Sequence, residues 1–486
     1  MDATIIYPHQ LFKVGTHPAL TTGRAVYLVE ETLLLNYNPS HRARLLLIRN
    51  AMQSYRKELL LHNHKVKYLD IHEYPTTDMV FKKLYTDGIS KLHIVDTTDN
   101  FLERSIVSAE KKFGFSRVFY DSPMFYFSKT ESMERYLKSR HNMARFYKQI
   151  RIDTRILMNN NKPLGGQFSF DLDNRKKIPK KTILPDDIIL SPVSKETFNW
   201  LKTIPGDFYG KSVTWLPHTH KEAEKFLKEF LRLRLINFGP YEDAIDTTHT
   251  RLWHSTLSPL LNIGLLTPKL VIETTLHYAE KHQTPIQSLE GFIRQIIGWR
   301  EFIRASYEVD GSSMRQKNFF YHKNPLPKGS WNGNTSVQPL DNTITTTLNL
   351  GYTHHIERLM VAGNFFLLTR THPHAIYHWF MAMYIDAYDW VMVPNIYGMS
   401  QFADGGSFAT KPYISGSSYL RKMSNYPKGD WEGLWTALYW LFIYDNHDFF
   451  SKNHRLSMMP KLLEKMDSEK RKLYFEQAKN YLDGYT

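Results

Sequence analysis

The feature that most constrains the fold is a change of pattern along the chain. Up to about residue 130, short runs rich in β-branched and aromatic residues alternate with helical stretches, as in a parallel sheet with crossover helices. Beyond about residue 200 such runs nearly vanish and amphipathic helices dominate. We therefore expect an α/β domain followed by an all-helical domain. The expected strands span residues 4–6, 25–30, 65–71, 91–95 and 117–120, and helical periodicity covers residues 40–63 and 77–85.

The chain has 486 residues, enough for two or three domains. We expect residues 1–130 to form the α/β domain, residues 131–200 an interdomain linker, and residues 201–486 the helical domain. The linker contains GGQFSFDLDNRKKIPKK, an irregular stretch in which basic residues follow an acidic pair. This stretch is either a solvated connector or a basic arm that touches phosphate.

The α/β part has one expected ligand site. Ligands of open parallel sheets bind beyond the carboxyl ends of the strands. The loops after the first two expected strands carry His9, Gln10 and Glu30, so we expect a pocket there. The sequence has no GxGxxG motif, and a standard dinucleotide site is therefore unsupported.

Charge and cysteine content restrict the partners and the chemistry. With 62 Lys and Arg against 48 Asp and Glu the net charge is +14, and 14% of residues are aromatic, which favours an anionic, flat partner such as nucleic acid or an aromatic cofactor. The absence of cysteine excludes thiol nucleophiles and thiolate metal sites. No signal peptide or spanning stretch is evident, so we expect a cytoplasmic protein without a membrane partner.

Four clusters in the helical part could carry chemistry. Adjacent His354 and His355 point about 100° apart on a helix, so one faces a pocket while the other supports it; such pairs are also often structural. Residues 253–259, WHSTLSP, suit a phosphate or form a simple helix cap. Asp386 and Asp389 need partners if they are buried, and Arg358 is one that is available. The loop 398–422 mixes small residues, rings and cations, which suits stacking on bases.

One helix has a clear apolar face. Within IQSLEGFIRQIIGWREFIRASY, apolar side chains recur at steps of three and four residues. They are Leu289, Phe292, Ile296, Trp299 and Ile303.

Several long strings carry a resemblance to a known family. They are NFGPYEDA from residue 237, LWHSTLSPLLNIGLLTP from 252, FIRQIIGWREFIR from 292, HHIERLMVAGNF from 354, and GMSQFADGG followed by ATKPYISG from 398. The chain resembles the photolyase and cryptochrome superfamily nearly end to end, and within it the bacterial iron-sulfur branch of (6-4) photolyases. The resemblance implies the photolyase fold, with a Rossmann-like antenna domain followed by a helical domain that binds FAD and acts on UV-damaged DNA as a monomer.

The resemblance also implies site residues. FAD would contact Tyr241, Ser255, Leu257, Ser258, Gln295, Arg300, Arg358, Asp386, Asp389 and Asn395. The DNA lesion would contact Leu359, Met399, Lys411, Tyr413, Tyr419 and Arg421, while Trp379 and Trp331 would relay electrons. The pocket of His9, Gln10 and Glu30 would hold 6,7-dimethyl-8-ribityllumazine as antenna, and Asp171 and Asp173 would lie near Mg²⁺.

The histidine pair acquires a chemical task from the resemblance. A (6-4) photoproduct carries a hydroxyl moved onto the 5′ base, so repair requires a positioned proton donor as well as an electron. By resemblance His355 is that donor and His354 its neighbour. The electron from excited reduced flavin is returned at the end, so there is no net redox change. The lesion must also leave the base stack to reach a buried flavin.

The sequence departs from its relatives at several positions. Gly298 is an extra residue in a helix, and such insertions are often accommodated as π-bulges. Phe380 stands where relatives tend to carry Tyr, and Met392 stands where we expect an acidic residue, with Asn395 as a possible substitute. The four cluster cysteines of the relatives are missing, so no iron-sulfur cluster is expected.

Three functions are consistent with these patterns. A light-dependent (6-4) DNA photolyase is favoured by the histidine pair and the tyrosine-rich loop. A cryptochrome-like blue-light photoreceptor with the same fold is the alternative, motivated by the missing cluster and by Met392. A DNA-binding protein without photochemistry is the third.

Overall fold

A five-stranded parallel sheet forms the N-terminal part of the computed structural model, which describes residues 1–35 and 39–484. The strands are β1 (Asp2–Ile6), β2 (Ala25–Val29), β4 (Val66–Leu69), β5 (Lys91–Val95) and β6 (Ser116–Tyr120), in the order β4-β2-β1-β5-β6. All five predicted strands are present, with ends shifted by at most two residues. The strand order reverses between β1 and β5, which is the doubly wound arrangement, so the expected fold class is confirmed.

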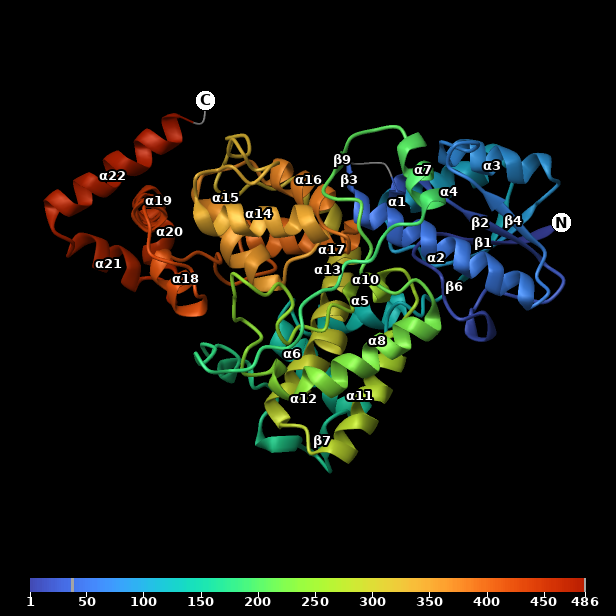
Figure 1. Cartoon of the computed structure of the whole chain (residues 1–486), viewed down its shortest axis with the longest axis horizontal. Coiled ribbons are helices and arrows are strands. Elements are labelled where there is room, and N and C mark those ends of the chain that lie inside the picture. The colour runs from blue at the N-terminus through green and yellow to red at the C-terminus, as the bar shows by residue number, and fades with distance from the viewer. Residues whose placement is uncertain (36–38, 485–486) are drawn as a thin grey trace.

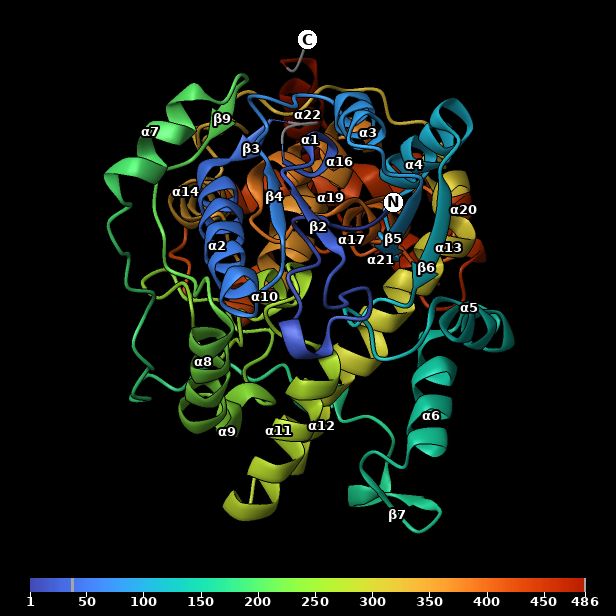
Figure 2. The ribbon, with the colours of Figure 1, turned by 90° about the vertical axis from the view of Figure 1, so that its right-hand side faces the viewer.

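Helices cover both faces of the sheet. Helix α2 (Arg42–Leu61) lies on one side, and α3 (Thr77–Thr86) and α4 (Asn100–Phe113) lie together on the other (Figure 2). Helices α2 and α3 match the predicted helical stretches within two residues. The side chains of β1 and β2 are almost completely buried from both sides, which explains their nearly continuous apolar sequence.

Residues 131–200, the expected linker, are partly regular. Helices α5 (Lys129–Lys138) and α6 (Met143–Thr154) pack against the helical part, and only the stretch from 164 to 194 runs largely without helix or strand. Helix α7 (Lys195–Thr203) then returns to α2. The short strands are β3 (Ser40–His41), which pairs with β9 (Phe208–Tyr209), and β7 (Met158–Asn159), which pairs with β8 (Lys162–Pro163).

The rest of the chain is helical (Figure 1). Its longer helices are α8 (His220–Leu233), α11 (Pro268–His282), α12 (Ile286–Ile293), α13 (Glu301–Met314), α14 (Gln338–Leu350), α16 (Pro373–Met383), α19 (Trp431–Asp445) and α22 (Ser468–Asp483). The shorter ones are α9 (Leu235–Phe238), α10 (Ser258–Asn262), α15 (Asn364–Leu368), α17 (Asp389–Val393), α18 (Ser417–Met423), α20 (His447–Lys452) and α21 (Met458–Glu464), and α1 (Thr32–Leu35) lies in the α/β part. None of the helices in residues 1–35 and 39–484 is both long and apolar enough to cross a bilayer.

Three π-helical segments interrupt these helices within the described chain: Arg294–Arg300, Glu357–Gly363 and Pro394–Ser400. The first contains Gly298, so the predicted π-bulge is confirmed. A Cβ on Gly298 would lie 2.9 Å from Met143 Cε and 3.1 Å from the Tyr147 ring, and the missing side chain therefore lets α6 pack closely on the bulge.

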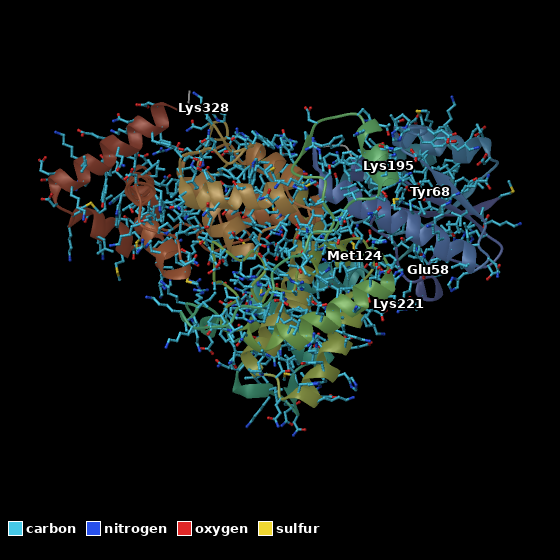
Figure 3. All side chains as sticks on the ribbon, in the orientation of Figure 1. Glu58, Tyr68, Met124, Lys195, Lys221 and Lys328 are labelled. Carbon is cyan, nitrogen blue, oxygen red and sulfur yellow. The ribbon has the colours of Figure 1, made fainter. Side chains whose placement is uncertain are left out.

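Buried polar contacts join the α/β part to the helices. Arg304 of α13 is fully buried and donates to Asp96 Oδ2 at the end of β5 over 2.7 Å. Burial opposes the charge of Asp96, but Arg304 and Lys129 outweigh it and keep the pKa of this carboxyl below its usual range. A second contact joins Glu58 of α2 to His220 of α8 at 3.1 Å, and side chains fill the space between these elements (Figure 3).

Removal of Arg304 should destabilise the protein strongly. The variant Arg304→Met leaves the buried Asp96 with Lys129, at 4.0 Å, as its remaining ion-pair partner among the described residues, so we expect a loss of about 3–5 kcal/mol in the free energy of unfolding. The double variant Asp96→Asn/Arg304→Met removes both charges and should recover most of that loss in urea unfolding. Equal destabilisation by the single and double variants would contradict this account.

Candidate functional site

A cavity of about 410 Å³ lies in the helical part. All three π-helical segments contribute to it. The first provides Arg294, Gln295, Ile296, Trp299 and Arg300, the second Arg358 and Leu359, and the third Asn395 and Met399. Phe292, Ile296, Trp299 and Ile303 from the predicted apolar face also line it. Because a π turn directs an extra side chain to one side, these segments concentrate functional groups around the cavity.

An ion pair lies at one side of the cavity. Arg358 donates to both carboxylate oxygens of Asp386, over 2.8 and 3.2 Å, and to the carbonyl of Thr353. Ser258 adds a hydrogen bond to Asp386 Oδ2 of 2.6 Å. The guanidinium also lies 4.1 Å from the ring centroid of Tyr384. Every polar group of this pair is thus satisfied, as a buried pair requires.

Arg300 extends this network across the cavity. Its guanidinium donates to Asn262 Oδ1 over 2.7 Å, and Asn262 donates to the backbone carbonyl of Asp386. The same guanidinium lies 4.8 Å from the Trp390 ring centroid and 5.3 Å from that of Phe125. Burial, together with Arg304, lowers the pKa of Arg300 to about 9, so it remains charged at neutral pH.

The two predicted histidines both line the cavity but in different ways. His355 is exposed to solvent through the cavity although protein surrounds it, while His354 is only 4% exposed. The His354 ring stacks on His254, with centroids 4.2 Å apart and planes 12° apart. Within the described residues neither ring nitrogen of His354 has a hydrogen-bond partner.

Burial keeps the three imidazoles neutral in this cavity. It lowers the pKa of His354 well below its usual value, and the neighbouring His254, His355 and Arg358 lower it further. The pKa of His254 falls to about 4 for the same main reason. Burial and then Arg358 lower the pKa of His355 to about 4. An anion placed in the cavity would raise these pKa values.

Glu357 adds a buried carboxyl to the same corner. Its Oε2 accepts from the backbone N–H of His354 over 3.2 Å and lies 3.4 Å from His354 Nε2. The neighbouring Arg358 is already occupied by Asp386. Burial therefore raises the pKa of Glu357 to about 7, although the His354 N–H and Arg358 oppose the shift.

Carboxyl groups surround Arg294 at the opposite side. Arg294 lies 3.2 Å from Asp171 and 3.7 Å from Glu242, and Gln295 donates to Glu242 over 2.5 Å. Burial raises the pKa of Glu242 to about 8, and nearby acids add to the shift while Arg294 opposes it. Asp171 lines the cavity but pairs with Arg175 and Arg294, whereas Asp173 lies outside it. Among the described residues no group of three acidic or histidine side chains could hold a metal ion, so Mg²⁺ stays a prediction.

Most of the predicted cofactor residues lie around one cavity. Lining residues are Ser255, Leu257, Ser258, Gln295, Arg300, Arg358, Asp386 and Asn395. Tyr241 lies outside the lining, and its ring packs against Trp253 with centroids 4.7 Å apart and planes tilted by 32°. Asp389 lies behind the cavity and accepts hydrogen bonds from Tyr307, Tyr377 and Arg315. Asn395, rather than the buried Met392, faces the cavity.

The predicted lesion residues divide into two groups. Leu359, Met399 and Tyr413 line the cavity. Lys411 and Tyr419 lie outside its lining. Like Tyr413, both lie near enough to Arg175 for its positive charge to affect their pKa. Arg421 is farther along and pairs with Glu432 at 3.1 Å.

The predicted antenna residues are engaged in hydrogen bonds. His9 Nε2 lies 2.9 Å from the Thr97 carbonyl, Gln10 donates to the Val95 carbonyl, and Glu30 accepts from Tyr68. The described cavity at this edge of the sheet, lined by residues 96–100 and parts of α13, has only about 80 Å³. A chromophore site at these residues stays a prediction.

Sequence reasoning did not single out several residues around the cavity. They are Arg294, which holds the acidic groups, His254, which stacks on His354, and the rings of Tyr352 and Trp390, which lie beside Arg358 and Arg300. His254 stands inside the WHSTLSP string, so that motif was the available signal.

The cavity suits a flat aromatic ligand with an anionic group. Trp299, Trp390 and Tyr352 provide rings, and Arg294 and Arg300 provide buried positive charge. The Trp390 Nε1–H has no partner within the described chain and can donate to a ligand. These features match the pockets that bind cofactors through apolar surfaces and a few placed polar groups.

Comparison with known proteins agrees with this geometry. A Synechocystis cryptochrome superimposes with a TM-score of 0.60 at 13% identity over 99% of both chains. A class III photolyase from Agrobacterium tumefaciens has the same TM-score and identity, over 100% of this chain and 98% of that chain. A family model described as deoxyribodipyrimidine photo-lyase-related protein matches residues 4–215. The chain therefore shares the fold of photolyases and cryptochromes, and its residues 4–215 are similar to this family model.

Two curated proteins are similar to parts of the chain. A (6-4) photolyase of Agrobacterium fabrum is 38% identical over 328 residues, which cover 65% of this chain and 65% of that protein. The chain therefore matches slightly less than two thirds of that relative's length. An uncharacterized protein of Acanthamoeba polyphaga mimivirus, R855, is 49% identical over 92 residues, or 19% of this chain and 75% of that one.

The raised pKa of Glu357 should appear in the stability of the protein. The pKa of this carboxyl is about 7 in the folded protein and 4.5 in the unfolded chain, so the folded state binds the proton more tightly. Its contribution to stability is therefore fully present below pH 4.5 and is lost as the pH rises through 7. Wild type should therefore lose up to about 3 kcal/mol relative to Glu357→Gln between pH 4.5 and 7. Gln keeps an acceptor for the His354 N–H.

Thermal unfolding of both proteins across this pH range measures the difference. The exposed Glu476→Gln serves as the control and should follow wild type. Parallel pH profiles for Glu357→Gln and wild type would show that Glu357 does not titrate in this window.

Proposed function

We propose that the protein repairs (6-4) photoproducts in DNA with the energy of light, using FAD bound in the cavity. The observation that carries the proposal is the placement of His355, which opens into the cavity close to the Arg358–Asp386 pair. The similarity to the (6-4) photolyase of Agrobacterium fabrum supports the choice of lesion. The net charge of +14 fits a DNA partner.

The residues around the cavity fit FAD. Arg358 and Asp386 would flank the flavin ring, Asn395 would face its polar edge, and Ser255, Leu257, Ser258, Gln295 and Arg300 would hold the remainder. When bound and reduced, FAD supplies the electron that light transfers to the lesion. The unpartnered Trp390 Nε1–H and the buried charge of Arg300 are the features of the chain that favour an anionic, flat cofactor.

His355 would provide the proton. A histidine with a pKa of about 4 is mostly neutral at pH 7, so the donor needs an anion nearby. The DNA phosphates and the negative charge that develops on the lesion supply this anion and raise the pKa of His355. His354, packed between His254 and Glu357, would fix the backbone that orients His355.

Trp379 and Trp331 would carry electrons from the surface to the cofactor. Trp379 is fully buried in α16 and Trp331 is 36% exposed. Phe380, next to Trp379, has no hydroxyl and contributes no redox-active phenol to this route.

A photoreceptor is the second candidate function, because the Synechocystis structure with the same fold is a cryptochrome. A photoreceptor has no use for a proton donor that opens into a lesion cavity, and the exposure of His355 therefore favours repair.

Replacement of His355 should separate cofactor binding from repair. We expect His355→Gln to keep bound flavin, since its side chain makes no contact that the ion pair needs, and to reduce repair by about 10²–10⁴-fold, the usual contribution of general acid catalysis. The assay follows loss of (6-4) photoproduct from a defined oligonucleotide under blue light, with flavin absorbance recorded on the same sample. The exposed His277→Gln is the matched control. Unchanged repair by His355→Gln would refute the proton-donor role.

A further inference from the structure

An aromatic pair lies at the surface end of the proposed electron route. The rings of Tyr209 and Trp331 are stacked, with centroids 4.5 Å apart and planes 21° apart. Tyr209 ends β9, and Trp331 lies in the loop between α13 and α14. Strand β9 packs on α16, which carries Trp379 (Figure 1). The stack therefore joins strand β9 to the loop before α14, next to the expected electron relay through Trp379.

A continuous chain of contacts leads from this stack to the cavity. The indole N–H of Trp379 donates to the carbonyl of Ser330, the residue before Trp331, over 2.8 Å. The Trp379 ring lies 5.9 Å from that of Tyr384, and Arg358 lies over Tyr384 at 4.1 Å. Arg358 lines the cavity. Ring contacts, one hydrogen bond and one peptide link thus connect the cavity with Tyr209.

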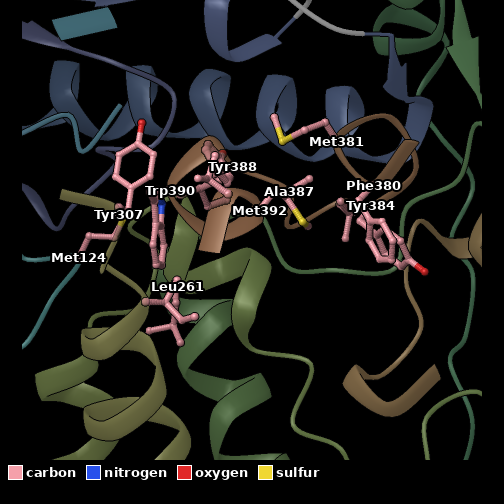
Figure 4. Close-up of a cluster of buried hydrophobic side chains, with 14 of the residues drawn as sticks. Met124, Leu261, Tyr307, Phe380, Met381, Tyr384, Ala387, Tyr388, Trp390 and Met392 are labelled. Carbon is pink, nitrogen blue, oxygen red and sulfur yellow. The ribbon is translucent and has the colours of Figure 1, made fainter. Parts of the chain in front are cut away.

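Tyr384 is a poor place for a lasting positive charge. It is fully buried and stacks on Phe380, with centroids 5.3 Å apart (Figure 4). Its hydroxyl contacts the hydroxyls of Thr347 and Thr353. An oxidised phenol becomes strongly acidic and is trapped only when it loses its proton, for which these neutral hydroxyls are weak acceptors.

Tyr209, unlike Tyr384, lies where its phenol can release a proton. It is half-buried, so solvent reaches the edge of the pair. Burial, with a contribution from the Asp207 carboxylate, raises the pKa of its phenol, which is therefore protonated in the ground state. The same negative charge and the nearby water favour departure of the proton once the ring has lost an electron.

We propose that Tyr209 is the terminal electron donor of the relay. One electron passes from Tyr209 to the Trp331 radical cation, the phenolic O–H bond breaks, and the proton passes to solvent. Trp331 is thereby restored and Tyr209 becomes a neutral radical. The ultimate electron acceptor is the photoexcited oxidised flavin, and a thiol in solution later returns an electron and a proton to Tyr209. The inference rests on the proposed binding of flavin.

Transient absorption of the flavin-loaded protein after a blue laser flash tests the inference. In wild type we expect the spectrum of a tryptophanyl radical to be replaced by the narrow band of a neutral tyrosyl radical. Tyr209→Phe keeps the stacked ring but has no phenolic proton, so the tyrosyl band should be lost and the tryptophanyl radical should persist until it recombines. Tyr321→Phe, at a tyrosine that is 81% exposed, should behave as wild type.

The outcomes distinguish a wrong assignment of Tyr209 from a failure of the protein to bind flavin. A tyrosyl band that survives in Tyr209→Phe would overturn the assignment, and so would wild type that shows only a tryptophanyl radical, because the stack would then serve packing alone. Purified protein that takes up no flavin would overturn the proposed function instead, and flavin absorbance before the flash reveals this case.

Discussion

The buried Arg358–Asp386 pair is the interaction on which the site depends. Two charges removed from water are stable only when further hydrogen bonds surround them, and here Ser258 and the Thr353 carbonyl complete the set. Asn262 then links the backbone of Asp386 to Arg300. The pair thus fixes α10, the first two π-helical segments and the turn before α17 around one cavity.

The protein around this cavity also sets the proton chemistry. Burial lowers the pKa of His354 and His355 and raises that of Glu357, so the surroundings of all three groups favour their neutral forms. Anionic ligands are the natural complement of such surroundings, because they restore the charged state of histidine. The proposed cofactor and the proposed DNA substrate are both anionic, which connects the geometry to the chemistry.

Sequence predicted the sheet well and the site in part. The central strands β1, β2 and β5 are buried on both faces, whereas the edge strands β4 and β6 are only partly buried. Their β-rich runs are local signals in the sequence, and all five strands were found. The π-bulge at Gly298 was predicted from an inserted residue, while the segments at Glu357–Gly363 and Pro394–Ser400 carry no such mark. Helices α5 and α6 lie where a linker was expected, because α5 packs on α13 and α6 packs on the π-helical segment Arg294–Arg300, both far along the chain. The stacking of His254 on His354 likewise joins residues a hundred positions apart.

Aromatic packing stabilises the C-terminal arm, which consists of helices α18 to α22. This is the part of the chain where we expect the relatives to carry their cluster cysteines. Trp435 of α19 is fully buried and lies 5.0 Å from Phe365, with Trp431 at 6.3 Å. This arm keeps its shape without thiolates, since the sequence has no cysteine.

Light-dependent repair by the wild-type protein tests the central claim most directly. The reduced, flavin-loaded protein is illuminated with blue light in the presence of an oligonucleotide that carries one (6-4) photoproduct, and intact dinucleotide is quantified by chromatography against a dark control. The account predicts restoration of the original bases in the illuminated sample alone. Fully reduced flavin with no lesion loss under light would contradict it.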